Sequence, residues 1–219
     1  EGRWDDVADE DWSLSWKQHW QPDPVGNGFL ILPAWLEVPL EHADRLVIRM
    51  DPGSAFGTGS HPTTRLCLEA LEMSPPKGSL VADLGCGSGV LGLAALGLGA
   101  QAVVAADTDS LAVRATTDNR SLNQHDEAQL AVALGSVETL QRLLAGQRAD
   151  LLLCNILAPV IEALAPSFEP LLVNDGRALL SGLLVDQAPR LKQVLGDLGW
   201  TVTASAEQGR WGLLEIRRA

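Results

Sequence analysis

The chain has 219 residues, of which 46% are hydrophobic, enough for one medium-sized domain with a buried core and a small appendage. Its net charge of −12, from 16 basic and 28 acidic residues, argues against nucleic acid as the main partner, because phosphate contacts need clustered Lys and Arg. No run of about 18 apolar residues predicts a membrane span, so neither nucleic acid nor a membrane is expected as a partner.

The three cysteines, Cys67, Cys86 and Cys154, lack the paired spacing of a metal or redox motif. They indicate a reducing, cytoplasmic setting in which the thiols are small buried hydrophobic groups. The acidic surface is typical of solubility and is also compatible with steering a basic protein substrate. Because the first residue is glutamate, we expect the chain to be a fragment.

The pattern divides the chain into a Trp-rich linker and lead-in over residues 1–45 and a catalytic domain over residues 46–219. Trp12, Trp16 and Trp20 recur every four residues and would share one stripe of a helix. Such a stripe is more often a packing face than a ligand platform.

Residues 21–45 contain several prolines and two short apolar pieces, Phe29–Leu32 and Val38–Leu40, which predict an irregular segment with a hairpin. Leu46–Met50 predicts a strand. The segment Asp51–Arg65, rich in glycine and proline, predicts a defined loop over the rim of the sheet that follows.

From residue 63, helical and strand-like periodicities alternate to the end of the chain. Helices are predicted over residues 63–73, 89–98, 109–120, 137–145, 157–171 and 186–198. Strands are predicted over residues 79–83, 102–106, 129–134, 150–154, 177–181, 200–206 and 211–217. This alternation predicts an α/β fold, a doubly wound, Rossmann-like sheet of seven strands. The short connection between the last two strands makes them a C-terminal antiparallel hairpin.

A glycine-rich turn follows the first strand of that sheet. The strand ends at Asp83, and Gly85, Gly87 and Gly89 follow at alternate positions before a helix begins. A turn without side chains lets a ligand lie against bare backbone at the positive end of a helix dipole. The next strand ends in Asp107, whose carboxylate can accept two hydrogen bonds from ribose hydroxyls. The pair predicts a nucleoside-cofactor site.

The identity of the cofactor depends on Asp83. Gly87, Gly89 and Gly92, with Asp107 downstream, also satisfy the pattern of dinucleotide-binding dehydrogenases, which stays an alternative. A carboxylate beside the loop suits a cationic sulfonium and would repel a pyrophosphate. The D-x-G-x-G-x-G form is the one that S-adenosylmethionine-dependent methyltransferases carry, so S-adenosylmethionine is the expected cofactor.

In open sheets of this kind, ligands bind beyond the carboxyl ends of the strands, where Gly135 and Asn155 also lie. Many methyltransferases of amide or amine nitrogen carry Asn-Pro-Pro-aromatic here, and the asparagine carbonyl accepts hydrogen bonds from the target nitrogen. The Asn155–Ala158 segment keeps only the asparagine, which favours an aliphatic amine over a planar base. The alternative is that Asn155 caps the following helix.

Two residues of the Asp51–Arg65 loop are further candidates. We expect Phe56 to cover the sulfonium, since a ring face near a cation contributes about 0.5–2 kcal/mol. His61 suggests a general base or a metal ligand, but no second histidine or carboxylate lies at ligand spacing, so no metal is expected. Holding the loop by hydrogen bonds is the favoured role of His61.

Four segments together resemble the PrmA family, the bacterial methyltransferases of ribosomal protein L11. They are the loop from Asp51 to Thr64, the glycine motif Asp83–Gly89, Asp107–Asp109 and Asn155–Ala158. The resemblance spans nearly the whole chain and rests most on the loop. It implies that Thr64, Gly85, Asp107 and Asn155 contact S-adenosylmethionine.

The same resemblance implies that lysine side-chain and N-terminal amines of a ribosomal protein are the substrate. The family carries a small recognition domain before its tryptophan segment, and only about ten residues precede that segment here. Two other functions stay open. One is a methyltransferase of another protein or of a small molecule, and the other is a non-catalytic nucleoside-binding module.

Overall fold

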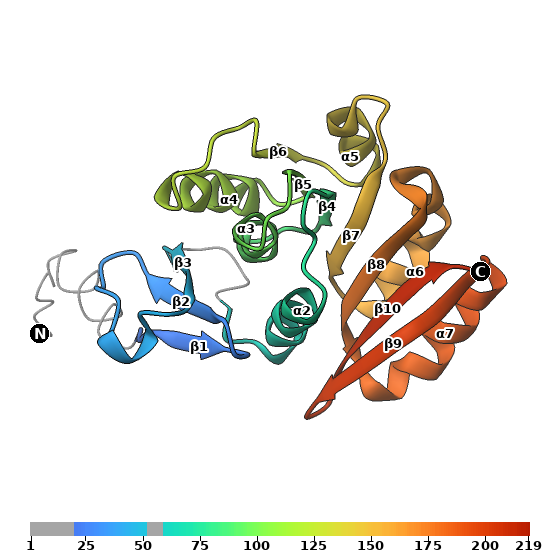
Figure 1. Ribbon diagram of the computed structural model, residues 1–219. Helices are drawn as coiled ribbons and strands as arrows, with labels where there is room; N and C mark the ends of the chain where they lie inside the picture. Colours follow the sequence, from blue (N-terminus) through green and yellow to red (C-terminus); the bar gives the residue numbers. More distant parts are fainter. Residues whose placement is uncertain (1–19, 52–58) are drawn as a thin grey trace, which may run out of the picture.

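Two β-sheets organise the residues that the computed structural model describes, 20–51 and 59–219 (Figure 1). Trp12, Trp16 and Phe56 lie outside these residues. In the described part, no helix combines the length and the apolar character needed to cross a membrane.

The smaller sheet has three strands, β1 (Asp23–Val25), β2 (Phe29–Pro33) and β3 (Leu46–Met50). Strand β1 pairs antiparallel with β2, and β2 pairs parallel with β3. The predicted hairpin is present, but its strands are β1 and β2. The apolar piece Val38–Leu40 is not a strand, because Pro39 has no N–H to donate to a ladder and Leu40, 93% exposed, begins a 3-10 turn.

The larger sheet has seven strands in the order β6-β5-β4-β7-β8-β10-β9. Their bounds are β4 (Leu80–Leu84), β5 (Ala102–Asp107), β6 (Leu130–Leu134), β7 (Ala149–Asn155), β8 (Leu172–Leu184), β9 (Trp200–Gln208) and β10 (Trp211–Arg218). The strands from β6 to β8 run parallel, and β10 pairs antiparallel with both β8 and β9. The predicted fold class, including the C-terminal hairpin, is therefore confirmed.

In the described part of the chain, six α-helices cover the large sheet. They are α2 (Pro62–Met73), α3 (Val90–Gly97), α4 (Ser110–Leu122), α5 (Val137–Leu144), α6 (Ala158–Leu164) and α7 (Ala188–Asp197). The single helix predicted over residues 157–171 is wrong in its second half. Pro166 and Pro170 cannot continue an α-helix, so α6 ends early and two 3-10 turns follow. Strand β8 then begins five residues earlier than predicted.

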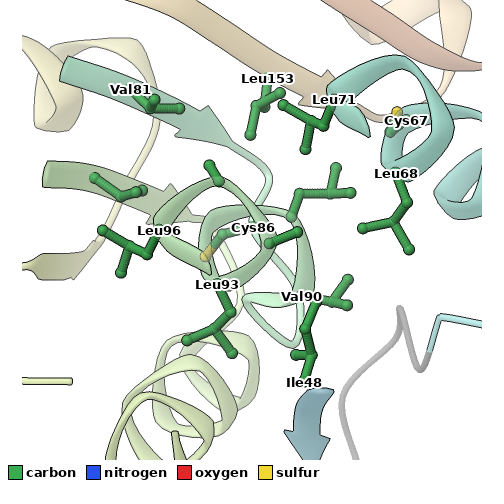
Figure 2. Packing of buried hydrophobic residues seen from close by; sticks show 14 of the residues in the cluster. Ile48, Cys67, Leu68, Leu71, Val81, Cys86, Val90, Leu93, Leu96 and Leu153 are labelled. Carbon is green, nitrogen blue, oxygen red and sulfur yellow. The ribbon is translucent and has the colours of Figure 1, made fainter. Parts of the chain in front are cut away.

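The alternation of side chains along β4 separates two hydrophobic cores. Val81 joins the cluster between the sheet and α2 and α3, and Ala82 and Leu84 join the cluster under α5, α6 and α7. Figure 2 shows the first cluster, with Leu68 and Leu71 of α2 and the α3 side chains gathered around the strands. All three cysteines are buried and free, as the sequence predicts.

Polar contacts attach the small sheet to α2 and α4, two helices of the large sheet. Arg65 of α2 bonds to Asp23 at 2.8 Å and to the carbonyl of Pro24 at 2.9 Å. Asn123, at the end of α4, both accepts from the backbone N–H of Arg49 and donates to its carbonyl. Because β3 and β2 form one sheet, the proposed division after residue 45 falls between two paired strands. These contacts hold the strand that leads towards α2 and the rim of the large sheet.

Candidate functional site: the rim of the large sheet

A cavity of about 420 Å³ opens at the carboxyl ends of β4, β5, β6 and β7. Its lining comes from the carboxyl-terminal parts of β4, β5, β6, β7 and β8, the start of β10, the first turn of α2, and α6. The lining residues are His61, Thr63, Leu84, Gly85, Gly87, Asp107, Thr108, Gly135, Ser136, Asn155, Ile156, Leu157, Val160, Leu164, Gly182 and Trp211. The cavity lies where ligands bind in open α/β sheets.

Five of the predicted site residues line this cavity together: Gly85, Gly87, Asp107, Gly135 and Asn155. Three others lie behind its wall, and Phe56 is not among the described residues. Those three are Thr64, Asp83 and Gly89, of which Thr64 and Asp83 are about 1% exposed. The structure thus brings the glycine turn, the ribose-binding acid and the asparagine into one space.

Asp107 anchors the glycine turn. Its Oδ2 accepts from the N–H of Gly87 at 2.9 Å, and its Oδ1 accepts from the N–H of Asp109 at 2.9 Å. Each carboxylate oxygen keeps a second lone pair for a ligand hydroxyl. Asp109 caps α4 by accepting from the N–H of Leu111 at 2.9 Å. The two neighbouring acids therefore have different tasks.

Helix α4 supports the turn from behind. The buried Thr116 donates to the carbonyl of Gly87 at 3.0 Å, and the buried Asn119 donates to the carbonyl of Ser88 at 2.9 Å. Gly89, with a φ of 82°, begins α3, and a Cβ there would lie 2.9 Å from the Thr116 side chain. The sequence alone does not predict these roles for Thr116 and Asn119, because polar residues within a helix carry no motif that marks them as supports.

Asp83 is enclosed between β4 and α3. Its Oδ2 is buried and has no hydrogen-bond partner among the described residues, and a Cβ at Gly92 would lie 3.4 Å from that oxygen. Burial raises the pKa of Asp83 to about 7, against a lowering by the Gly92 N–H, and the charge of Asp107 adds to the rise. Asp83 does not line the cavity, so a direct contact with a ligand is not part of this geometry.

Asn155 ends β7 with its amide group at the cavity. Its Nδ2 donates to Thr64 Oγ1 at 3.4 Å, so the hydroxyl of α2 orients the amide and leaves Oδ1 as an acceptor. The N-cap of α6 is Leu157, without a side-chain cap. The alternative that Asn155 caps the following helix is therefore wrong.

Two glycines leave the space that Ile156, the residue after Asn155, occupies. Gly85 has a φ of 74°, and a Cβ there would overlap the side chain of Ile156. Gly182 has a φ of 85°, and a Cβ there would overlap the carbonyl oxygen of Ile156. The N–H of Ile156 donates to the carbonyl of Ser181 at 3.1 Å. This close packing fixes the backbone that carries the Asn155 side chain.

The wall on the α2 side includes His61, a candidate from the sequence, and Trp211, which the sequence does not mark. His61 caps α2, and its Nδ1 lies 2.8 Å from Thr63 Oγ1, in agreement with a loop-holding role. Its ring meets that of Trp211 edge to face, with centroids 4.9 Å apart. Among the described residues, no three His, Cys, Asp or Glu side chains gather as metal ligands would. No sequence motif marks Trp211 or Gly182, and the pairing of β8 with β10 brings both residues to the cavity.

The seven-stranded sheet, the glycine turn after β4 and the acid at the end of β5 define an S-adenosylmethionine-dependent methyltransferase. The whole chain, residues 1–219, matches the family described as "Ribosomal protein L11 methyltransferase (PrmA)". The chain belongs to this family. The dehydrogenase alternative is therefore wrong.

Individual relatives agree with the family. A ribosomal protein L11 methyltransferase of Parasynechococcus marenigrum is 82% identical over 218 residues, covering 100% of this chain and 75% of that protein. One of Synechococcus elongatus is 50% identical over 209 residues, covering 95% of this chain and 69% of that protein.

Solved structures agree as well. The ribosomal protein L11 methylase of Lactobacillus delbrueckii subsp. bulgaricus has a TM-score of 0.80 and 33% identity, with coverage of 91% of this chain and 99% of that one. The structure of SMU.776 complexed with SAH has a TM-score of 0.59 and 14% identity, with coverage of 70% of this chain and 49% of that one. At this identity, the similarity shows the fold alone.

Proposed function

We propose that this chain transfers methyl groups from S-adenosylmethionine to amine nitrogens of ribosomal protein L11, both lysine side-chain amines and the N-terminal amine. The observation that carries the proposal is one cavity lined by both the glycine turn with Asp107 and Asn155, whose Nδ2 donates to Thr64 so that its carbonyl oxygen is the acceptor. A cofactor site and an acceptor for a target nitrogen then share one space. The family supports ribosomal protein L11 as the substrate.

The lining fits the cofactor. The described lining residues include the carboxylate Asp107 and no Lys or Arg, so a pyrophosphate would lack a cationic partner while a sulfonium would meet no like charge. Gly85 and Gly87 leave the backbone bare where the ligand would approach. We propose that these glycines, Gly135 and Asp107 hold the cofactor, with Asp107 accepting the ribose hydroxyls.

The residues behind the wall act indirectly in this proposal. Thr64 orients the amide of Asn155. Gly89 lets α3 begin directly after the turn, and Asp83 lies beneath the turn without touching the cavity. Covering of the sulfonium by Phe56 stays part of the proposal.

Asn155 orients the amine. S-adenosylmethionine, when bound, supplies an electrophilic methyl group on a good leaving group. Only a neutral amine has the lone pair to accept it, and a free lysine with a pKa near ~10.4 is almost wholly charged at neutral pH. The apolar lining, including Leu84 and Ile156, disfavours the ammonium form, and Asn155 Oδ1 accepts a hydrogen bond from the neutral nitrogen. Positioning supplies much of the rate gain, so no strong base is needed.

We further propose a linker over residues 1–45, a catalytic domain over residues 46–219, and action in the cytoplasm. No nucleic-acid or membrane partner is needed.

The cofactor assignment is tested by melting the chain with S-adenosylhomocysteine and with NAD. At a hundredfold excess of ligand over its dissociation constant, S-adenosylhomocysteine should stabilise the fold by about 2.7 kcal/mol. Stabilisation by NAD alone would contradict the assignment. Transfer of a labelled methyl group to purified ribosomal protein L11 tests the acceptor, and label found only on glutamine or on a small molecule would favour the other methyltransferase functions.

A further inference from the structure

Strand β8 lies between the strand that carries Asn155 and the strand that carries Trp211, and both residues line the cavity. Ser181 of β8 pairs with Asn155 of β7, and Leu184 of β8 pairs with Trp211 of β10. Between these pairs the register shifts, because Ser181 pairs with Leu213 and Gly182 has no partner on β10. Such a bulge bends a strand and re-aims the side chains near it. Asn155, Gly182 and Trp211 line the same cavity.

The Trp211 ring is held in place. It is half-buried at the beginning of β10 and meets the His61 ring at 4.9 Å between centroids, with an angle of 69° between the planes. His61 is itself held by Thr63, 2.8 Å from its Nδ1. A ring fixed by a neighbour loses little further freedom when a ligand packs against it.

Trp211 supplies the aromatic surface that the sequence after Asn155 lacks. The residues that follow Asn155 are aliphatic, and Trp211 is the only Phe or Trp among the described residues that line the cavity. An indole carries a large apolar face. A lysine side chain packs its methylene groups along apolar surface while its nitrogen reaches a polar partner. The α-amine of a chain terminus has no such methylene arm.

From this arrangement we infer that Trp211 is a specificity-determining residue, the wall along which the aliphatic arm of a target lysine lies when its nitrogen reaches Asn155. The inference rests on the proposed amine methylation and deepens it. It implies that lysine amines and α-amines use the same acceptor but depend differently on Trp211.

Two peptides test the inference: an N-acetylated peptide with one lysine, and a lysine-free peptide with a free N-terminus. Trp211→Ala should lower kcat/KM for the lysine peptide about tenfold, equal to about 1.4 kcal/mol. It should leave the N-terminal peptide within about twofold and the calorimetric affinity for S-adenosylhomocysteine unchanged. Trp211→Phe should keep most activity on both peptides. Trp35→Ala is the matched control, because it removes a half-exposed tryptophan outside the lining. It should leave kcat/KM unchanged for both peptides.

The outcomes separate the inference from the proposed function. An equal fall for both peptides, or no fall for either, with unchanged S-adenosylhomocysteine affinity, would overturn the role of Trp211 alone. If the wild-type chain methylates neither peptide, the proposed amine methylation fails and the inference fails with it. Should Trp211→Ala not fold, Trp211→Leu keeps an apolar side chain, and it should shift the ratio between the peptides in the same direction by a smaller factor.

Discussion

Replacing Asp107 by alanine should separate cofactor binding from folding. The carboxylate accepts from the N–H groups of Gly87 and Asp109, both at 2.9 Å, and lines the cavity. Loss of its hydrogen bonds to the ribose should weaken S-adenosylhomocysteine binding by about 1.5–3 kcal/mol, or about 10- to 150-fold. The two N–H groups lose their acceptor at a site that water can reach, so the free energy of unfolding should fall by only about 1–2 kcal/mol.

Asp109→Ala is the matched control, because it removes the same charge two residues away. Its carboxylate caps α4, so this variant should lose about 1 kcal/mol of stability. Its affinity for S-adenosylhomocysteine should stay within about twofold of the wild type. Titration calorimetry and urea unfolding of both variants give the two quantities. If Asp107→Ala collapses in stability while it binds as tightly as the wild type, Asp107 is only a structural acceptor and the ribose role is wrong.

Three further predictions follow from the site. Asn155→Ala should lower kcat far more than the melting temperature, whereas Asn123→Ala, which breaks the contact with the small sheet, should lower the melting temperature and spare kcat per folded enzyme. Gly182→Ala should lower kcat because its Cβ displaces the backbone after Asn155, whereas Gly212→Ala, across the same bulge with room for a Cβ, should not. Burial raises the pKa of Asp83 to about 7 in the folded state, so its contribution to the free energy of unfolding is fully present below about pH 4. That contribution is lost as the pH rises through about 7. Chemical unfolding at pH 5 and pH 8 should therefore show Asp83→Asn gaining stability over the wild type as the pH rises, and a constant difference would contradict the shifted pKa.

The sequence predicts most of the fold because its signals are local. Hydrophobic periodicity and glycine turns place the strands and helices of the large sheet to within a few residues. The two errors, the end of the helix predicted over residues 157–171 and the apolar piece Val38–Leu40, both come from prolines whose effect the hydrophobic pattern does not show. Pro166 and Pro170 lie inside an otherwise helical pattern, and the apolar Leu40 follows a proline that prevents strand pairing.

For the site, the cofactor half and Asn155 are predictable from the sequence, and the rest of the substrate half is not. The glycine turn and Asp107 follow two successive strands of the sequence pattern, and in the structure the Gly87 N–H donates to Asp107. Gly182 and Trp211 reach the cavity only through the register of β8 with β10, which includes a bulge. A bulge depends on which residues oppose one another, and a single strand read alone does not contain that information.

Mass analysis of labelled ribosomal proteins tests most directly whether this chain methylates amines of ribosomal protein L11. A mixture of ribosomal proteins is incubated with the chain and isotopically labelled S-adenosylmethionine, and the labelled sites are mapped. We expect label on ribosomal protein L11, at lysine side chains and the N-terminal amine, and loss of that label with Asn155→Ala. Label on other proteins, label on atoms other than amine nitrogen, or undiminished label with Asn155→Ala would contradict it.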